Sequence, residues 1–263
     1  MKNLLLILFV FSVATSEAQY FRPAETLMDK NLLKDYFLLH MALADSDLQQ
    51  IKNKKVTLRF SVDEFGQPGN FEIIKGISPE ADQEAIRLVK NLLWQPATRN
   101  GNPTVDQQEI EVPFHYKHLQ RLQKKGFAKA PEIKEFPKCL SQNIHSFAAL
   151  EKAPEPILTD DMTLNQFIIA NLNYPEEAYN RNISGTVSMD FIIEKNGLAS
   201  NIVITESVGG GCDQEAIRLL QSIQWFPGMV QDSLVRSKNH LDILFTLGDK
   251  RMQNIPNRQG TNL

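Results

Sequence analysis

The heptapeptide DQEAIRL at residues 82–88 occurs a second time, unchanged, at residues 213–219. The offset between the two copies is 213 − 82 = 131, and it continues without a gap on both sides. Over the aligned stretches 56–115 and 187–246, 15 of the 60 residue pairs are identical, where unrelated chains of ordinary composition would give about 4. The sequence therefore predicts a duplicated domain.

Hydrophobic alternation around the heptapeptide predicts the strands of each copy. Residues 56–63 and 187–194 alternate apolar and polar side chains, which is typical of a strand with one buried face. A turn follows in each copy, with Asn-Gly at 196–197 in the second, and a further apolar run completes a hairpin. Residues 110–114 and 241–247 alternate again and predict a third strand.

A helix is predicted in each copy between the hairpin and the third strand. Apolar residues follow Asp82 at helical spacing, and we expect Asp82 and its counterpart Asp213 to be the N-cap residues. A second helical run precedes the first strand. Each copy therefore has the order α-β-β-α-β, which predicts an α+β fold, a three-stranded antiparallel sheet covered on one face by two helices.

The repeat divides the chain into two domains, expected at 27–116 and 160–248, each large enough for a small core. The linker between them is expected at 117–159. Its first part, 117–138, has a net charge of +5 (7 − 2), which is typical of a solvated segment and would also suit an anionic surface. Residues 249–263 contain few apolar side chains and are expected to be a disordered tail. The sequence leaves open whether the two domains pack together.

The overall composition is that of an ordinary globular protein, 42% hydrophobic with a net charge of −3 over 263 residues. This charge balance argues against binding to nucleic acid. Residues 1–18 combine a basic start, a ten-residue apolar run and small residues before position 19, which predicts a secretory signal peptide cleaved after Ala18. A retained membrane anchor is the alternative, although a spanning helix needs about 20 apolar residues.

Cys139 and Cys212 are the two cysteines of the chain. In an oxidising compartment they could form a disulfide that closes the loop from 139 to 212 and contributes about 4 kcal/mol. Two separate thiols are the alternative.

The sequence has no recognisable catalytic or metal-binding motif. The five histidines lack the spacing of a metal site. The three glycines 209–211 precede a predicted helix but lack the Lys-Ser/Thr of a phosphate-binding loop, so a plain turn is expected. We therefore expect no cofactor, no metal and no small-molecule substrate, and an enzyme is the least favoured class.

A set of short motifs runs in order through the second copy: FIIANLNYPEEA at 167–178, GTV at 185–187, Asn-Gly at 196–197, three glycines at 209–211, EA at 215–216 and WFPG at 225–228. The first copy keeps WQPA at 94–97, NGNP at 100–103 and VPF at 112–114, but has Leu43-Ala44 where the second has Tyr174-Pro175. In this ordered set, both copies resemble the C-terminal domain of TonB, the periplasmic energy transducer of Gram-negative bacteria.

The resemblance implies a periplasmic protein that binds an extended segment of an outer-membrane transporter or another envelope protein by strand addition to a sheet edge. A TonB transducer also has an uncleaved membrane helix and a long Pro-rich spacer, whereas this linker contains four prolines. We therefore expect a peptide-binding adaptor. The alternative is a divergent transducer with a retained N-terminus and an inner-membrane partner, which would couple the proton gradient to TonB-dependent transporters.

The resemblance also places the third strand at a sheet edge, where 109–115 and 240–247 would offer unpaired backbone groups. Pro113 stands opposite Leu244 (113 + 131), and proline has no N–H to donate. The first edge is therefore blunted, which predicts that the second domain binds the partner; otherwise Pro113 only guards against aggregation. The expected partner-binding residues are His240, Leu241, Asp242, Ile243, Leu244, Phe245 and Thr246, together with Asn171, Tyr174 and Pro175.

Overall fold

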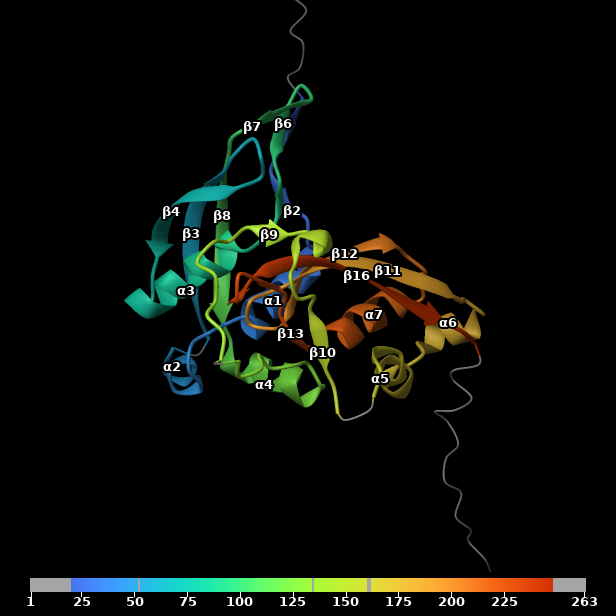
Figure 1. The fold of residues 1–263 in the computed structure, drawn as a ribbon. Coiled ribbons are helices and arrows are strands. Elements are labelled where there is room, and N and C mark those ends of the chain that lie inside the picture. Colours follow the sequence, from blue (N-terminus) through green and yellow to red (C-terminus); the bar gives the residue numbers. More distant parts are fainter. Residues whose placement is uncertain (1–19, 52, 134, 160–161, 248–263) are drawn as a thin grey trace, which may run out of the picture.

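The computed structural model describes residues 20–51, 53–133, 135–159 and 162–247, which form two mixed α/β units (Figure 1). We call residues 20–124 unit one, residues 151–247 unit two, and residues 125–150 the connecting segment. The expected signal peptide, 1–18, and the expected tail, 249–263, lie outside the described residues. Within the described residues, no helix has the length and apolar character required to cross a membrane.

Unit one has the predicted order, with α1 before a β3–β4 hairpin, α3 after it, and β8 as the third strand. Its elements are β1 (Phe21–Arg22), β2 (Glu25–Thr26), α1 (Lys30–Leu39), α2 (Asp45–Gln50), β3 (Lys54–Val62), β4 (Pro68–Lys75), α3 (Pro79–Lys90), β5 (Trp94–Gln95), β6 (Ala97–Arg99), β7 (Asn102–Thr104), β8 (Asp106–Phe114) and α4 (Tyr116–Lys124). The other elements flank the predicted five or lie between them.

Unit two repeats this order after the connecting segment, which itself contains β9 (Ile144–His145) and a short 3-10 helix (Phe147–Ala149). The elements of unit two are β10 (Glu155–Ile157), α5 (Leu164–Asn171), α6 (Glu176–Asn180), β11 (Gly185–Ile193), β12 (Ala199–Glu206), α7 (Cys212–Gln221), β13 (Gln224–Phe226), β14 (Met229–Val230), β15 (Ser233–Leu234) and β16 (Arg236–Phe245).

Each unit contains its own main sheet, in which the first strand is central. The strand order is β4-β3-β8 in unit one and β12-β11-β16-β9 in unit two. Neighbours are antiparallel except for β9, which runs parallel to the start of β16. The predicted α+β fold with two tandem copies is therefore confirmed, and the two main sheets stay separate. The predicted three-stranded antiparallel sheet is found in unit one, whereas β9 adds a fourth, parallel strand in unit two.

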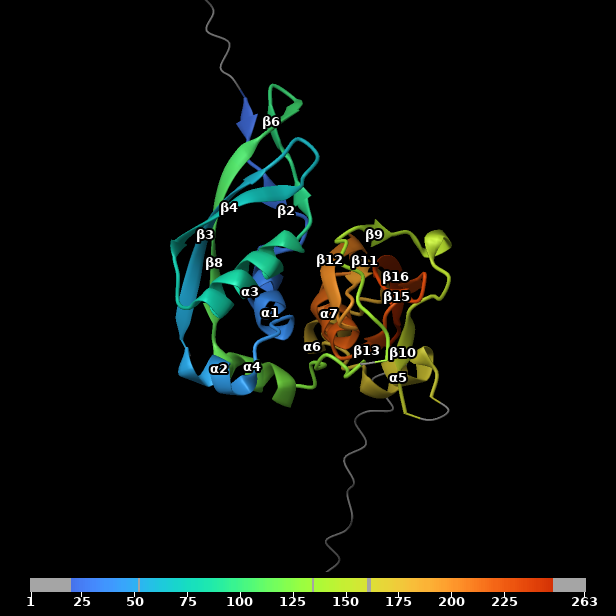
Figure 2. The same ribbon diagram turned by 60° about the vertical axis from the view of Figure 1, so that its left-hand side comes forward.

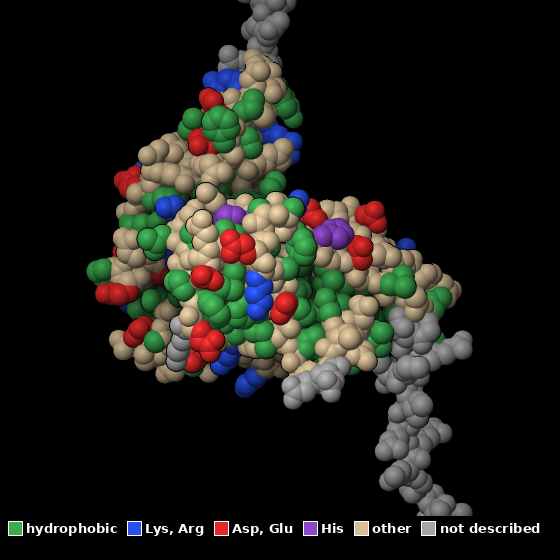
Figure 3. Space-filling model, viewed as in Figure 1, with side chains coloured by type: hydrophobic (Ala, Val, Ile, Leu, Met, Phe, Trp, Pro, Cys, Tyr) green, Lys and Arg blue, Asp and Glu red, His purple; other side chains and the backbone are tan. Residues whose placement is uncertain are grey.

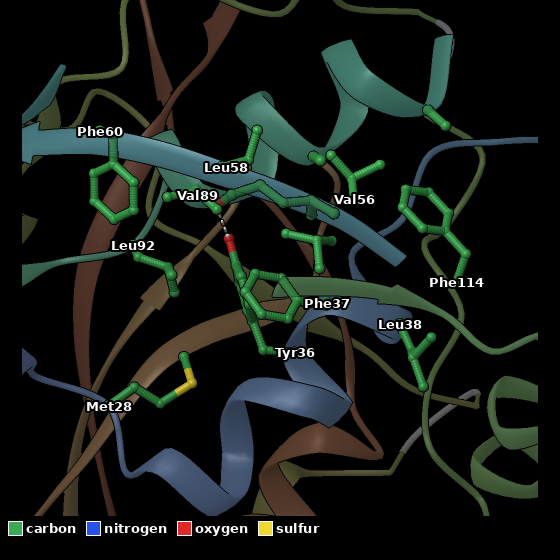
Figure 4. Close-up of a cluster of buried hydrophobic side chains, with 14 of the residues drawn as sticks. Met28, Tyr36, Phe37, Leu38, Val56, Leu58, Phe60, Val89, Leu92 and Phe114 are labelled. Atoms are coloured by element: carbon green, nitrogen blue, oxygen red, sulfur yellow. Dashed lines mark hydrogen bonds between the residues drawn. The ribbon is translucent and has the colours of Figure 1, made fainter. Parts of the chain in front are cut away.

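The core of each unit lies between its sheet and the helices that cover one face. In unit one, Phe60 and Phe114 are fully buried, and the Tyr36 hydroxyl donates to the Leu88 carbonyl at 2.8 Å inside this core (Figure 4). Burial of large side chains supplies most of the stability of so small a domain. Each tryptophan packs on the central phenylalanine of its own sheet: Trp94 lies 5.2 Å from Phe60 and Trp225 lies 6.1 Å from Phe191, between ring centroids.

The predicted N-caps are wrong. α3 begins after Ser78, whose hydroxyl accepts from the Ala81 N–H, and α7 begins after Gly211, whose φ of 91° suits glycine. Asp82 and Asp213 lie further along their helices, where their carboxylates accept N–H groups of the preceding loop, from Ile77 (2.9 Å) and Val208 (3.0 Å) respectively. Both aspartates therefore close the loop in front of the helix.

The expected linker region, 117–159, is folded along much of its length. Leu119 and Leu122 of α4 belong to the core of unit one. Further along, the connecting segment lies against unit two, where β9 pairs with β16 and Lys138 forms a single bridge to Leu234. The last part of the expected linker belongs to unit two itself, where β10 pairs with β13 and Lys152 forms a bridge to Met229. The connecting segment thus packs on the units that it joins.

The structural repeat includes strands that precede the expected domain starts at 27 and 160. β2 pairs with β5 in unit one, and β10 pairs with β13 at the corresponding place in unit two. Likewise β1 pairs with β6, and the Lys152–Met229 bridge lies at the corresponding place in unit two, shifted by one residue from the offset of the repeat. An extended N-terminal segment therefore closes the same end of both units.

The two units lie side by side, with α1 and α3 of unit one next to β12 of unit two (Figure 2). Leu32 of unit one packs against both cores, and the Ala128 N–H of the connecting segment donates to the Gln221 carbonyl of unit two. β12 is an edge strand of its sheet, so unit one covers an edge that would otherwise be open.

The burial of Phe191 gives a direct test of the unit-two core. Phe191 is 2% exposed, so Phe191→Ala should lower the free energy of unfolding by about 3–5 kcal/mol. Phe147 is 62% exposed. Phe147→Ala is the matched control and should change the free energy of unfolding by less than about 0.5 kcal/mol. Urea unfolding monitored by circular dichroism measures both. Equal stability of Phe191→Ala and the parent would contradict this assignment of the core.

Candidate partner-binding edge

The third strand of unit two, β16, is open along most of one side. On its inner side it pairs with β11 from Ser237 to Phe245. On its outer side it pairs with β9 only at Arg236 and Ser237. In the described part of the chain, no strand pairs with the outer side of residues 238–245. This stretch is therefore a candidate edge for an incoming strand.

Unit one shows which backbone groups of such a strand point outward. The Phe114 carbonyl accepts from the Asn53 N–H at 2.9 Å, so Phe114 faces β3. The backbone groups of successive residues point to opposite sides of a strand. Those of the neighbouring Pro113 therefore point away from β3. Pro113 pairs with Lys55 as Leu244 pairs with Thr186, in the same register. The Leu244 N–H therefore faces outward, and with it those of alternate residues back along the strand.

The side chains of β16 alternate between the core and the solvent. Ile243 and Phe245 are buried beneath the sheet, and Leu241 packs on the same core. His240, Asp242 and Leu244 are exposed on the other face, Leu244 to 60%. Thr246 follows the strand. Native edge strands are commonly blunted by charged side chains or proline, and Leu244 is neither.

An ionic cluster lies on the solvent face of this edge. His240 contacts the carboxylates of Asp190 and Asp242 at 2.8 and 3.0 Å, and Lys238 contacts Asp190 at 2.9 Å. The hydrogen bond to Asp190 raises the pKa of His240, and the same bond lowers the pKa of Asp190. Because these groups are exposed, the cluster sets the charge of the edge and contributes little to stability.

The other three expected residues lie on the helix side of the sheet, away from the open edge. Tyr174 is buried, its ring stands edge-on to Phe245 at 5.9 Å, and its hydroxyl donates to the Ile183 carbonyl. Pro175 is the N-cap of α6, and Asn171 ends α5 with its side chain bonded to the Phe167 carbonyl. Tyr174 and Pro175 therefore lie under β16 on the helix side of the sheet and form no part of the open edge.

A buried ion pair at the start of β16 was not predicted from the sequence. Arg236 and Glu194 have side chains only 3% and 6% exposed, and their closest oxygen and nitrogen lie 2.7 Å apart. Arg236 also donates to the Asn91 carbonyl of unit one at 2.7 Å and to the Gln142 carbonyl of the connecting segment at 3.2 Å. One guanidinium therefore joins three parts of the chain.

Further polar contacts at this junction are also buried. Asn201 accepts from the Leu93 N–H at 2.8 Å and donates to the Asn91 carbonyl at 3.0 Å. His40 Nε2 lies 3.0 Å from the Ala199 carbonyl. Buried polar groups that are satisfied only in one arrangement fix that arrangement, because separating them would leave unpaired donors. The two units are therefore held in a defined orientation.

A cavity lies beside this junction. It has a volume of about 230 Å³ and is lined by His40, Ala42, Arg87, Asn91, Lys138, Gln142, Glu194, Lys195 and Asn196. This lining contains no hydroxyl or thiol side chain, and the Lys195 amine donates to the Cys139 and Ser141 carbonyls. No group of three or more His, Cys, Asp or Glu side chains among the described residues is placed to hold a metal ion.

Both cysteines are free thiols in the structure, which favours two separate thiols over a disulfide between them. Cys139 is half-buried in the connecting segment, where its N–H donates to the Leu234 carbonyl at 2.9 Å. Cys212 is buried in the first turn of α7. The three glycines before α7 all have positive φ values, as expected for a turn.

Acid should weaken the junction through His40. Burial lowers its pKa to about 4, whereas the unfolded chain binds this proton below about pH 6.5. The free energy of unfolding therefore falls by up to about 3 kcal/mol as the pH falls from about 6.5 to about 4. In His40→Gln, whose amide can still donate to Ala199, this loss should be absent. Urea unfolding of both proteins at neutral pH and near the folded pKa measures it, and an equal loss in the two would contradict the prediction.

Comparison with known proteins supports the same interpretation of the chain. A family model described as the Gram-negative bacterial TonB protein C-terminal matches residues 51–118 and 170–247, one segment in each unit. No curated protein matches the chain. The two matched segments cover more than half of the chain and include both main sheets apart from β9. The chain belongs to the TonB C-terminal family, with two tandem copies of its domain and a TonB-like role in the envelope and its transport systems.

Proposed function

We propose that this protein is a periplasmic adaptor that binds an extended segment of an outer-membrane transporter or another envelope protein by strand addition to β16. The observation that supports this most strongly is the open outer side of residues 238–245, with the Leu244 N–H directed outward. A partner strand laid along this side would gain main-chain hydrogen bonds from alternate residues.

The edge also offers side-chain recognition. Leu244 would be covered by an apolar residue of the incoming strand, because neighbouring side chains on one face of a sheet lie about 5 Å apart. Beside it, Asp242 and His240 would meet polar or basic residues of that strand. β9 occupies the first two positions of the same side, so the bound segment would end next to Ser237.

The connecting segment supports an adaptor over a transducer. A transducer needs a long extended spacer to transmit force, whereas here the connecting segment packs on unit two through β9 and the bridge from Lys138 to Leu234. The junction at Arg236 holds the units together. We propose that cleavage after Ala18 releases the chain into the periplasm, which N-terminal sequencing of the periplasmic protein tests: Gln19 as the first residue supports the adaptor, and Met1 supports the transducer.

The substitution Leu244→Pro should weaken the binding without unfolding the chain. Pro113 occupies the same register position in unit one, so the fold tolerates proline there. Loss of one main-chain hydrogen bond, about 1 kcal/mol, should weaken binding at least about fivefold. Calorimetric titration measures it, with a synthetic peptide of the periplasm-facing N-terminal segment of a TonB-dependent transporter.

The reciprocal substitution, Pro113→Leu, is the matched control and should leave the affinity of this peptide unchanged. Unchanged affinity in a folded Leu244→Pro protein would exclude β16 as the binding edge. Loss of the circular dichroism spectrum in Leu244→Pro would show that the Leu244 N–H is needed inside the sheet.

A further inference from the structure

The two units differ at the end of the sheet where the third strand begins. In unit two, the connecting segment covers this end: β9 pairs in parallel with Arg236 and Ser237, and Pro131 lies over the turn at Gly197. Arg236 and Ser237 are 3% and 0% exposed, and Arg236 also contacts Asn91 of unit one. The unit-two end is therefore closed by an extended strand of the same chain.

The corresponding end of unit one carries no such cover among the described residues. At the offset of the repeat, Arg236 corresponds to Val105 and the turn residue Asn196 corresponds to Phe65. Val105 is 53% exposed and Phe65 is 84% exposed. Hydrophobic side chains lie on the surface at this upper end of the molecule, where β6 and β7 are found (Figures 1 and 3).

The two exposed apolar residues belong to one corner of the sheet. Val62, the last residue of β3, pairs with Asp106, the first residue of β8. Phe65 follows Val62 in the β3–β4 turn, and Val105 immediately precedes Asp106. Gly66 in this turn has the same tight approach to the Trp94 carbonyl that Gly197 has to the Trp225 carbonyl, so the two corners share one backbone shape.

The backbone groups of Val105 point away from β3, as pairing with an added strand requires. Phe114 faces β3, and the alternation along β8 makes Pro113 and every second residue back to Val105 face outward. Arg236, the counterpart of Val105, is the residue that pairs with Ile144 in unit two. Pro103 replaces Leu234, whose N–H bonds to the Pro137 carbonyl, so a strand in unit one could pair at Val105 but not at that earlier position.

We propose that this corner, Phe65 and Val105 with the start of β8, is a second docking surface, which takes an extended apolar segment of another protein. The segment would pair in parallel with β8 at Val105 and Asp106, as β9 pairs with β16, and would place an apolar side chain against Phe65. The connecting segment shows what such an occupant looks like, because its Pro131 and Ile144 cover the equivalent corner of unit two. That segment is already bound there, so unit one needs an external strand.

A random dodecapeptide library displayed on phage provides the probe. Selection uses the chain from Gln19 onward carrying Leu244→Pro, so that peptides specific for the β16 edge are depleted. The selected peptides are synthesised and titrated against the parent, Leu244→Pro and Val105→Pro. We expect equal affinity for the first two and a loss of about fivefold or more in Val105→Pro. Proline at 105 should be tolerated because Pro113 is tolerated at an outward position of β8, the strand that Val105 precedes.

Two further readouts make the result specific. Phe65→Ser, at a solvent-exposed turn position, should weaken the same peptides while leaving the unfolding curve unchanged. Bound peptide should slow hydrogen exchange at the Val105 amide, because that N–H becomes paired. If no selected peptide depends on Val105 or Phe65, the docking surface is excluded, whatever the outcome at β16.

Two other occupants would also overturn the proposal. If peptides bind the chain that starts at Gln19 but not the chain that starts at Met1, the protein's own segment 1–18 fills the corner. If sedimentation of the parent gives a dimer that Val105→Pro dissociates, a second copy fills it.

Discussion

The buried ion pair between Arg236 and Glu194 is the contact on which the arrangement of this protein depends. Placing two charges out of water is costly and is repaid only when their hydrogen bonds are complete. Glu194 accepts twice from Arg236 and once from the Ser200 hydroxyl, and Arg236 also donates to one carbonyl in unit one and one in the connecting segment. Every one of these partners must be in place at once, so the pair specifies a single packing of the units.

The position of this pair links the junction to the proposed binding edge. Arg236 is the first residue of β16, and Leu244 lies near the far end of the same strand. The pair and β9 fix one end of the strand, and Tyr174 packs against Phe245 at the other. β16 is thus held at both ends while its outer side stays open between them. An edge held in this way has little conformational entropy left to lose when a strand is added.

The fold could be predicted from the sequence because the repeat records it, and the resemblance to the TonB domain places the third strand at the sheet edge. Two aligned copies with the same alternation define the strands, and Pro113 opposite Leu244 shows which side of the third strand faces outward. The junction left no such signal: Arg236 aligns with Val105 and Glu194 with Asp63, so the repeat does not show that the pair exists. Asp82 and Asp213 look like caps, but the loop before each helix provides closer donors, and their carboxylates bind those instead. The pairing of β9 with β16 involves only two residues and carries no periodic pattern.

Each unit contains one tryptophan, Trp94 or Trp225, and both are buried, so fluorescence can follow the units separately. The most direct measurement is urea unfolding of Trp94→Phe, in which fluorescence reports unit two alone while circular dichroism reports both units. We expect the two curves to coincide in this protein, because the junction makes the units unfold together. Adding Arg236→Met leaves Glu194 buried without its partner and should lower the free energy of unfolding of unit two by about 3–5 kcal/mol. The fluorescence transition should then move to a lower urea concentration than the main circular dichroism transition. Separate curves before Arg236 is changed, or coincident curves afterwards, would contradict the central role of this ion pair.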